Sequence, residues 1–241
     1  MRGEQQGFER FSWVIRAQHM VLAASVLILI ATGLPLKYPH SAYARFVFSL
    51  THGVHVSGVI HRIGAIGLIA VGVFHMSWLV LTKQGRGNFR ALLPRFQDLK
   101  DVVTNVLWYL GLSAKRARFG RFSYIEKFDY WAVYWGSVIM IGSGLVLWFV
   151  DKAMHFLPKT VVDVALEAHS DEALLATLAI FVWHFYNVHL SPDHFPMSTT
   201  WLTGRTSRED MLKHHPLDYE DLQEKEREAQ ASPLSGKTNG D

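Results

Sequence analysis

The chain has 241 residues, of which 49% are hydrophobic and 19% are charged, and its formal net charge is +3. Soluble domains carry about 25% charged residues, so long apolar blocks in this composition are typical of an integral membrane protein rather than a soluble globule. The absence of cysteine excludes disulfides, iron–sulfur clusters, thiolate-ligated haem and covalent c-type haem, whereas 13 histidines make imidazole the abundant potential metal ligand.

Four apolar blocks predict membrane helices at residues 11–36, 60–82, 131–150 and 173–190, because each is close to the about 20 residues that span a bilayer. The first block precedes no small-residue cleavage site, which indicates a retained span rather than a signal peptide. We therefore expect an all-α membrane protein, a bundle of four transmembrane helices, whose domain covers residues 1–223. The polar tail at 224–241 cannot bury a core, so we expect it to be disordered and cytosolic.

Lysine and arginine predict the orientation of these spans. The loop 83–130 is rich in basic residues, whereas loops 37–59 and 151–172 contain only Lys37, Arg45, Lys152 and Lys159. Basic loops stay on the cytosolic side, so this loop and both termini are expected in the cytosol. Apolar residues repeat at helical spacing within the loop (Leu99, Val102, Val103, Val106, Leu107 and Leu110). They predict an interfacial helix on the inner membrane surface, although a helix packed on a soluble partner fits the same pattern.

Histidines lie inside the apolar blocks, where ionisable residues are expensive and indicate function. His61 and His75 are about 21 Å apart on one face of the second span, and His169 and His184 are about 22 Å apart on the fourth segment, within about 60° of one face. This spacing places His61 and His169 at the outer edge of the membrane and His75 and His184 in its inner half. His19 of the first span joins the inner layer.

Imidazoles at two depths favour two haems, each held by histidines from different helices. Neutral imidazole binds iron and bridges helices without burying a net charge. Glycines on the second and third spans would give flat surfaces for such groups, or equally for close helix packing (Gly64, Gly67, Gly72, Gly136, Gly142 and Gly144). His189 lies about 140° around an ideal helix from His184, so we assign it no role.

Two alternatives belong to other functional classes. A proton or ion transporter could use membrane histidines as a relay, but it would usually also need a buried carboxylate, and the four predicted blocks contain none in mid-span. A membrane anchor without haem would need no histidines at these depths. A zinc protease is excluded, because the chain lacks the H-E-x-x-H motif.

Residues 8–223 resemble the membrane-embedded b-type cytochrome, or gamma, subunit of bacterial respiratory formate dehydrogenases, which is related to subunits of hydrogenases and thiosulfate reductases. The resemblance rests on four stretches: FERFSWVIRAQHMVLAASVLILIATG, HRIGAIGLIAVGVFHM, SYIEKFDYWAVYWGSVIMIGSGLVLW and LTGRTSREDMLKHHPLDYEDL. It implies a multi-pass protein of the bacterial inner membrane that binds two haems b and has a quinone site beside the inner haem. This sequence differs from the pattern in having one more residue between His169 and His184, and a third histidine, His75, at the inner level.

Carried over to this chain, the resemblance implies that His61 and His169 hold the outer haem and that His19 and His184 hold the inner one. By depth alone, His75 is an alternative inner ligand, or a contact for a propionate, a quinone or a further cofactor. Ser123, Glu126 and Lys127 at the start of the third span could supply hydrogen bonds and protons to menaquinone or ubiquinone. An interfacial cluster that only anchors the helix fits these three residues as well.

The resulting expectation is an electron-transfer subunit of a respiratory oxidoreductase complex rather than a stand-alone catalyst. It would connect a periplasmic iron–sulfur or multihaem cytochrome subunit with the quinone pool. The sequence leaves the direction of electron flow and the substrate of the partner open.

Overall fold

The computed structural model describes residues 7–192, 195 and 197–231. The chain divides into two compact units. The spanning unit comprises Phe11–Arg86 and Asp129–Gly204, and the polar unit comprises Met1–Arg10, Gly87–Phe128 and Arg205–Asp241. Each unit is described by itself.

The spanning unit contains four helices that are long and apolar enough to cross a membrane. They are α1 (Trp13–Lys37), α3 (Val54–Leu81), α6 (Tyr124–Trp148), whose first turn belongs to the polar unit, and the continuous stretch Lys159–Leu190. They confirm the prediction of an all-α membrane protein with four spanning helices. Short helices α2 (Ala42–Leu50), α7 (Val150–Phe156) and α9 (Thr200–Thr203) complete the unit.

Helix α1 begins at Trp13, close to the predicted 11, but the other three spanning helices begin earlier than the predicted blocks. Helix α3 starts at Val54 rather than 60, α6 at Tyr124 rather than 131, and the fourth helix at Lys159 rather than 173. Hydropathy marks only the part of a helix that fits the hydrocarbon, whereas the backbone hydrogen bonds of the helix can continue beyond it. As a result, His169 lies well inside a helix instead of ahead of one.

The fourth spanning helix changes its hydrogen-bonding pattern partway. Helix α8 (Lys159–Leu178) is followed by two π-helical segments, η1 (Ala179–His184) and η2 (Tyr186–Leu190). A π-helix bonds residue i to i+5, so each hydrogen-bonded turn holds one more residue than in an α-helix. Segment η1 lies between His169 and His184, the interval in which the resemblance implies one additional residue.

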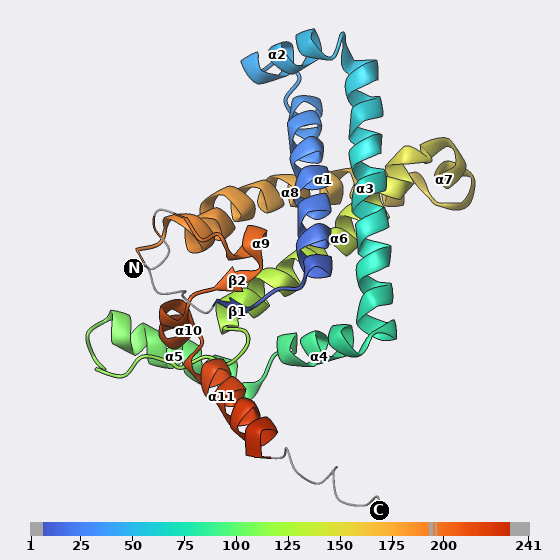
Figure 1. The fold of residues 1–241 in the computed structure, drawn as a ribbon. Helices are drawn as coiled ribbons and strands as arrows, with labels where there is room; N and C mark the ends of the chain where they lie inside the picture. The colour runs from blue at the N-terminus through green and yellow to red at the C-terminus, as the bar shows by residue number, and fades with distance from the viewer. Residues whose placement is uncertain (1–6, 193–194, 196, 232–241) are drawn as a thin grey trace, which may run out of the picture. The chain divides into compact units, whose positions relative to one another are not determined.

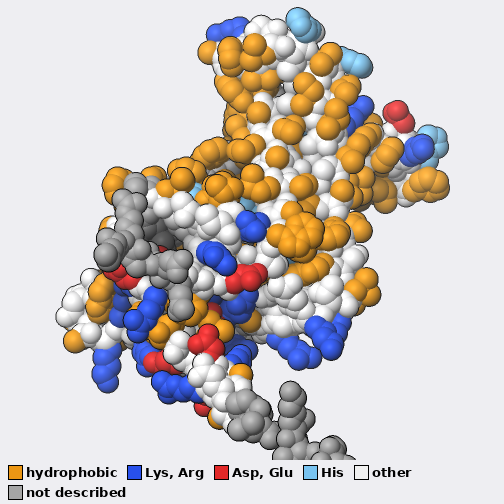
Figure 2. Space-filling view, in the orientation of Figure 1, with side chains coloured by type: hydrophobic (Ala, Val, Ile, Leu, Met, Phe, Trp, Pro, Cys, Tyr) orange, Lys and Arg blue, Asp and Glu red, His pale blue; other side chains and the backbone are white. Residues whose placement is uncertain are grey.

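Helices α1 and α3 lie side by side and antiparallel (Figure 1). Small residues allow this approach: a Cβ atom added at Gly64 of α3 would lie 3.0 Å from Ile28 Cγ2 and 3.3 Å from the Ser25 carbonyl oxygen of α1. On the face shown in Figure 2, hydrophobic side chains cover most of these two helices. The packing is therefore tight between the helices and apolar outside, as lipid requires.

The polar unit contains the antiparallel pair β1 (Phe8–Glu9) and β2 (Arg205–Thr206), α5 (Phe96–Tyr109), α10 (Arg208–His214) and α11 (Pro216–Ala231). Helix α4 (Lys83–Leu92) connects the two units along the chain. Helix α5 corresponds to the predicted interfacial helix, and its polar Asp101 and Asn105 are buried while apolar Leu99 and Val103 are exposed. An outward apolar face is what a helix on a membrane surface needs.

The tail differs from the expected disorder at its start. Helix α11 continues through Ala231, so residues 224–231 are helical, and residues 232–241 lie outside the described part of the chain. The segment is rich in Glu, Lys, Arg, Gln and Ala, which are strong helix formers even where no core is buried. The expectation of disorder considered only the low apolar content of the segment and not its helical propensity.

Candidate metal centre

The structure brings His61 of α3 and His169 of α8 together. Their ring centroids are 6.4 Å apart and the ring planes are inclined by 70°. Each ring makes a side-chain hydrogen bond at Nδ1, to Thr32 Oγ1 at 2.9 Å and to Ser143 Oγ at 3.0 Å, and each also has a backbone hydrogen bond, to Leu29 and to Met140 respectively. Within the described part of the chain, no side chain bonds the Nε2 atom of either ring.

The two imidazoles are supported in the same way by the other two spanning helices. A Cβ atom added at Gly33 of α1 would lie 3.2 Å from His61 Cε1, and one added at Gly144 of α6 would lie 3.1 Å from His169 Cε1. Each glycine directly follows the hydroxyl residue that bonds the same ring. We call these pairs the Thr32–Gly33 seat and the Ser143–Gly144 seat. All four spanning helices thus contribute to the outer level.

His184 of η1 lies beside a carboxylate of α6 at the inner level. Its Nδ1 is 3.2 Å from Asp129 Oδ2, while the indole Nε1 of Trp183 donates to Asp129 Oδ1 at 2.7 Å. Because a carboxylate only accepts, neutral His184 carries its proton on Nδ1 and presents the Nε2 lone pair elsewhere. The sequence placed His184 at this depth but gave no signal for Asp129 as its partner.

His19 of α1 lies in the same region. It interacts electrostatically with His184 and His189, and its ring centroid is 6.1 Å from that of Trp201. His189 lies 6.2 Å from Trp201 on the same measure. The exclusion of His189 assumed an α-helix. In the π-helical stretch, residues five apart lie nearly above one another, so His184 and His189 share a side of the helix.

His75 of α3 has partners at both ring nitrogens. Its Nδ1 donates to Gln18 Oε1 of α1 at 2.8 Å, and the Tyr130 hydroxyl of α6 lies 3.1 Å from Nε2. Since an amide oxygen only accepts, Nε2 is the acceptor for the tyrosine hydroxyl. His75 is therefore part of a hydrogen-bonded chain through three helices.

Several buried nitrogen atoms near this level have no hydrogen-bond partner within the described part of the chain. They are Gln18 Nε2, His19 Nδ1 and Trp201 Nε1. Buried donors are normally paired, and an orphaned group points to a bound partner such as water or a ligand. Three such atoms beside the inner histidines fit the polar edge of a bound group.

Ser123 and Glu126 form a capping box at the start of α6. The Ser123 hydroxyl accepts from the Glu126 backbone N–H at 3.3 Å, and the Glu126 carboxylate accepts from the Ser123 N–H at 2.7 Å. Lys127 pairs with both oxygens of Asp98, at 2.7 and 2.9 Å. The spacing S-x-x-E is a sequence signature of such a cap. These contacts favour the helix-anchor interpretation that the sequence left open.

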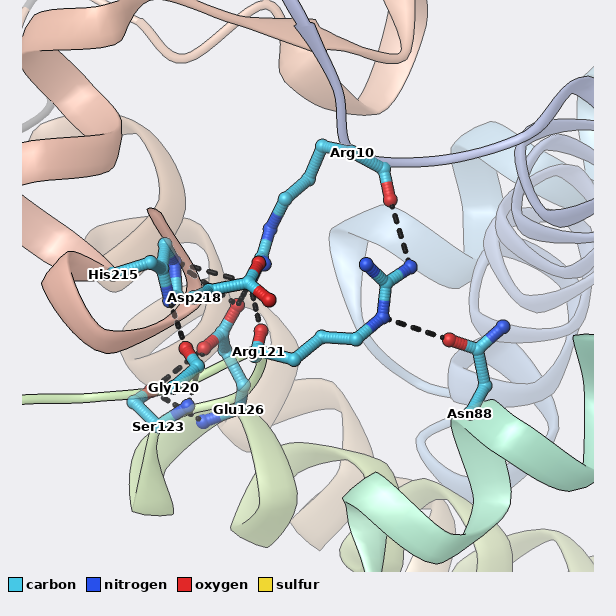
Figure 3. A network of polar contacts seen from close by, with 8 residues as sticks. All are labelled: Arg10, Asn88, Gly120, Arg121, Ser123, Glu126, His215 and Asp218. Carbon is cyan, nitrogen blue, oxygen red and sulfur yellow. Dashed lines mark hydrogen bonds and ion pairs between the residues drawn. The ribbon is translucent and has the colours of Figure 1, made fainter. Parts of the chain in front are cut away.

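Glu126 also belongs to a buried ionic network in the polar unit (Figure 3). Arg10 is 4% exposed and bonds Glu126 at 3.3 Å, Asp218 at 3.0 Å and the backbone carbonyl of Arg121. His215 donates to the Gly120 carbonyl at 2.9 Å. Burial lowers the pKa of His215, against the opposing effect of Glu126. The network joins the N-terminal segment, the start of α6 and the tail.

Glu172 is a carboxylate within the fourth spanning helix, one turn beyond His169. A Cβ atom added at Gly136 of α6 would lie 2.7 Å from its Oε1, so the carboxylate lies against the backbone of that helix. The expectation that the spans lack such a carboxylate assumed a helix that begins at 173. The longer helix brings one in.

One known protein family matches the chain. The model of the family described as prokaryotic cytochrome b561 matches residues 10–191, which include all the histidines of the two levels. None of the curated proteins compared matches the chain.

Proposed function

The chain belongs to the prokaryotic cytochrome b561 family of membrane b-type cytochromes, and we propose that it holds two haems b and passes electrons between a periplasmic redox partner and the membrane quinone pool. The observation that carries this proposal is the His61–His169 pair, with ring centroids 6.4 Å apart. A metal–imidazole bond of about 2 Å, plus about 1 Å from nitrogen to ring centre, gives about 6 Å between two imidazoles that share one metal ion.

The contacts also support His19 and His184 as the inner pair. His184 has its Nδ1 engaged by Asp129, and His19 is half-buried and close to it. His75 would have to give up the Tyr130 hydroxyl to bind iron through Nε2. The unpaired donors of Gln18, His19 and Trp201 fit a group with a polar or anionic edge, such as a haem propionate.

Haem b supplies one-electron chemistry at each level. The chain's own part is to fix the ligand imidazoles through Thr32, Ser143 and Asp129, and to exclude water with apolar helices. Such partners of ligating histidines set ring orientation and ligand basicity. The rise of a helix separates the two levels by about 20 Å, which covers most of the hydrocarbon.

The quinone contact belongs on the inner side. Ser123, Glu126 and Lys127 remain candidates, although their side chains are engaged in the cap and the ion pair. His75 is the better supported candidate, because its chain to Tyr130 and Gln18 offers a hydroxyl, an imidazole and an amide beside His19. A quinone needs hydrogen-bond donors at its carbonyls and a proton route, and these groups supply both.

We further propose that the protein lies in the bacterial inner membrane with both termini in the cytosol, on the strength of its basic loop 83–130. The partner on the opposite face would be a periplasmic iron–sulfur or multihaem cytochrome subunit. Copurification from native membranes identifies that partner directly.

A reduced-minus-oxidised visible spectrum of the purified chain tests the proposal. We expect b-type bands from two haems per chain, loss of the outer haem in His61→Ala or His169→Ala, and loss of the inner haem in His184→Ala or His19→Ala. The variant His75→Ala should keep both haems and slow quinone reduction. A colourless protein from haem-replete cells would contradict the whole proposal, and loss of the inner haem in His75→Ala would reassign that ligand.

The rival function is a histidine-relay transporter, which Glu172 and Asp129 favour, because both carboxylates lie within the spanning unit. The same spectrum separates the two functions. A relay predicts no haem, and it predicts that Glu172→Gln abolishes proton or ion flux in vesicles.

A further inference from the structure

The Thr32–Gly33 seat on α1 and the Ser143–Gly144 seat on α6 have the same arrangement of hydrogen bonds. Thr32 follows α1 residue Ile28 by four positions, and Ser143 follows α6 residue Ile139 by four. Each hydroxyl donates to that carbonyl, Thr32 Oγ1 to Ile28 O at 2.7 Å and Ser143 Oγ to Ile139 O at 2.6 Å. Each also contacts one histidine Nδ1 across the helix interface.

The single proton of a hydroxyl decides the direction of the second bond. A hydroxyl that donates to a backbone carbonyl can only accept at its other contact. Thr32 therefore accepts from His61 Nδ1–H, and Ser143 accepts from His169 Nδ1–H. Both imidazoles are thereby held in the tautomer that carries its lone pair on Nε2.

The glycine beside each hydroxyl sets the position of the ring. A Cβ atom added at Gly33 would lie 3.2 Å from Cε1 of His61, and one added at Gly144 would lie 3.1 Å from Cε1 of His169. Cε1 lies between the two ring nitrogens, so a methyl group there would push Nε2 away from its present place. By contrast, a Cβ atom at Gly142, two residues from Gly144, would meet nothing within 4 Å.

We propose that the Thr32–Gly33 and Ser143–Gly144 seats are positioning elements that fix tautomer, orientation and donor strength of the outer ligand imidazoles. This inference rests on the proposed function, in which His61 and His169 share one haem. The hydroxyls tune the basicity of the ligands, and therefore the outer midpoint potential, while the glycines decide whether the outer haem is held.

Redox titration of the visible spectrum tests the hydroxyls. Loss of the acceptor makes the imidazole a weaker donor to oxidised iron, so the outer haem becomes easier to reduce. We expect Thr32→Val and Ser143→Ala each to raise one of the two midpoint potentials by about 30–60 mV. For one electron this shift corresponds to a three- to tenfold change in the oxidised-to-reduced ratio. The double variant should shift the outer midpoint potential by the sum of the two single shifts. Thr32→Ser keeps the hydroxyl and should therefore keep the wild-type potential, which gives a second comparison if Thr32→Val folds poorly.

Two matched variants act as controls. Ser77 donates to the Val73 carbonyl at 2.8 Å and Thr177 to the Ala173 carbonyl at 2.7 Å, which is the same intrahelical bond, and neither hydroxyl bonds a histidine within the described part of the chain. Ser77→Ala and Thr177→Val should leave both potentials unchanged. Gly33→Ala and Gly144→Ala should remove up to half of the haem, whereas Gly142→Ala should remove none.

The outcomes separate the inference from the function beneath it. Two haems with unshifted potentials in Thr32→Val and Ser143→Ala, or equal shifts in the control variants, would contradict the positioning role of the two seats. Either result would leave the proposed cytochrome function standing. A wild-type chain without two b haems, or His61→Ala with both haems retained, would overturn the proposed function itself.

Discussion

Asp129 makes the hydrogen-bond acceptor of the histidine at the inner proposed haem level different from the acceptors at the outer level. At the outer level each imidazole faces a neutral hydroxyl, whereas at the inner level His184 faces a carboxylate 3.2 Å away. A carboxylate accepts hydrogen bonds more strongly than a hydroxyl and gives the imidazole more anionic character. A more basic imidazole stabilises oxidised iron, so Asp129 should lower the inner midpoint potential.

Replacing the charge at this position should therefore raise that potential. In Asp129→Asn the amide oxygen still accepts from His184 but carries no net charge, and we expect the inner midpoint potential to rise by on the order of 60 mV, a tenfold change for one electron. Redox titration measures the shift. Asp163→Asn is the control, because Asp163 is an exposed carboxylate paired with Lys159. A shift confined to the other haem would mean that His184 is not an inner ligand.

Burial distinguishes two lysine–aspartate pairs of the chain. Lys127 pairs with Asp98, with side chains 10% and 19% exposed, whereas the Lys159–Asp163 side chains are 75% and 55% exposed. Lys127→Met leaves a partly buried carboxylate without its partner and should destabilise the fold by about 3 kcal/mol. Lys159→Met should cost less than about 1 kcal/mol. Thermal unfolding in detergent compares them, and equal losses would contradict the assignment.

At the scale of elements, small residues decide how α1 and α3 meet. A methyl group at Gly67 would overlap Ser25 Oγ of α1, and one at Gly64 would press on Ile28, whereas one at Gly72 of the same helix would meet nothing within 4 Å. His61 precedes Gly64 by one turn. The contact between these helices therefore also determines how the imidazole approaches the outer level.

We expect Gly67→Ala to destabilise the protein by about 1–3 kcal/mol through overpacking, even though alanine is the better helix former by about 1 kcal/mol. Gly72→Ala gains only that propensity and should be neutral or stabilising. The temperature at which the haem absorbance is lost reports the difference. If both variants behave alike, the interface is not as tight as the structure indicates.

The same scale shows what the sequence could and could not predict. From residue numbers alone, helical rise predicted that His61 and His169 share one level, and the structure brings these two rings together. The side of the helix at His189 could not be predicted, because hydropathy does not distinguish a π-helix from an α-helix. The two seats could not be predicted from the sequence either. A threonine or serine before a glycine is common, and only the structure shows that a histidine contacts both residues of each pair.

For the whole molecule, the two units are built for different solvents. In the most apolar stretch of each spanning helix, at most 28% of the residues are buried inside the protein, so most of that apolar surface is available to lipid. The polar unit instead contains a buried group of paired charges around Arg10, which is 4% exposed. The spanning unit holds the histidines of both levels, while the polar unit joins the N-terminal segment to the tail.

The two units should therefore respond differently to pH. Burial lowers the pKa of His215 below its ordinary 6.5, beside Arg10, Glu126 and Asp218, so the folded state binds this proton less tightly than the unfolded state. The stability contributed by neutral His215 is complete above pH 6.5 and falls as the pH drops towards the folded pKa, by about 1.4 kcal/mol for each unit of difference.

Limited proteolysis of the tail at pH 7.5 and 5.5 measures this effect, with the visible spectrum recorded in parallel. We expect cleavage of α10 and α11 to accelerate at the lower pH while the haem bands persist, and His215→Gln to remove the pH dependence of cleavage. His155→Gln, at an exposed histidine of the spanning unit, is the matched control and should behave as wild type. Cleavage that stays pH-dependent in His215→Gln would assign the titration to another group of the network.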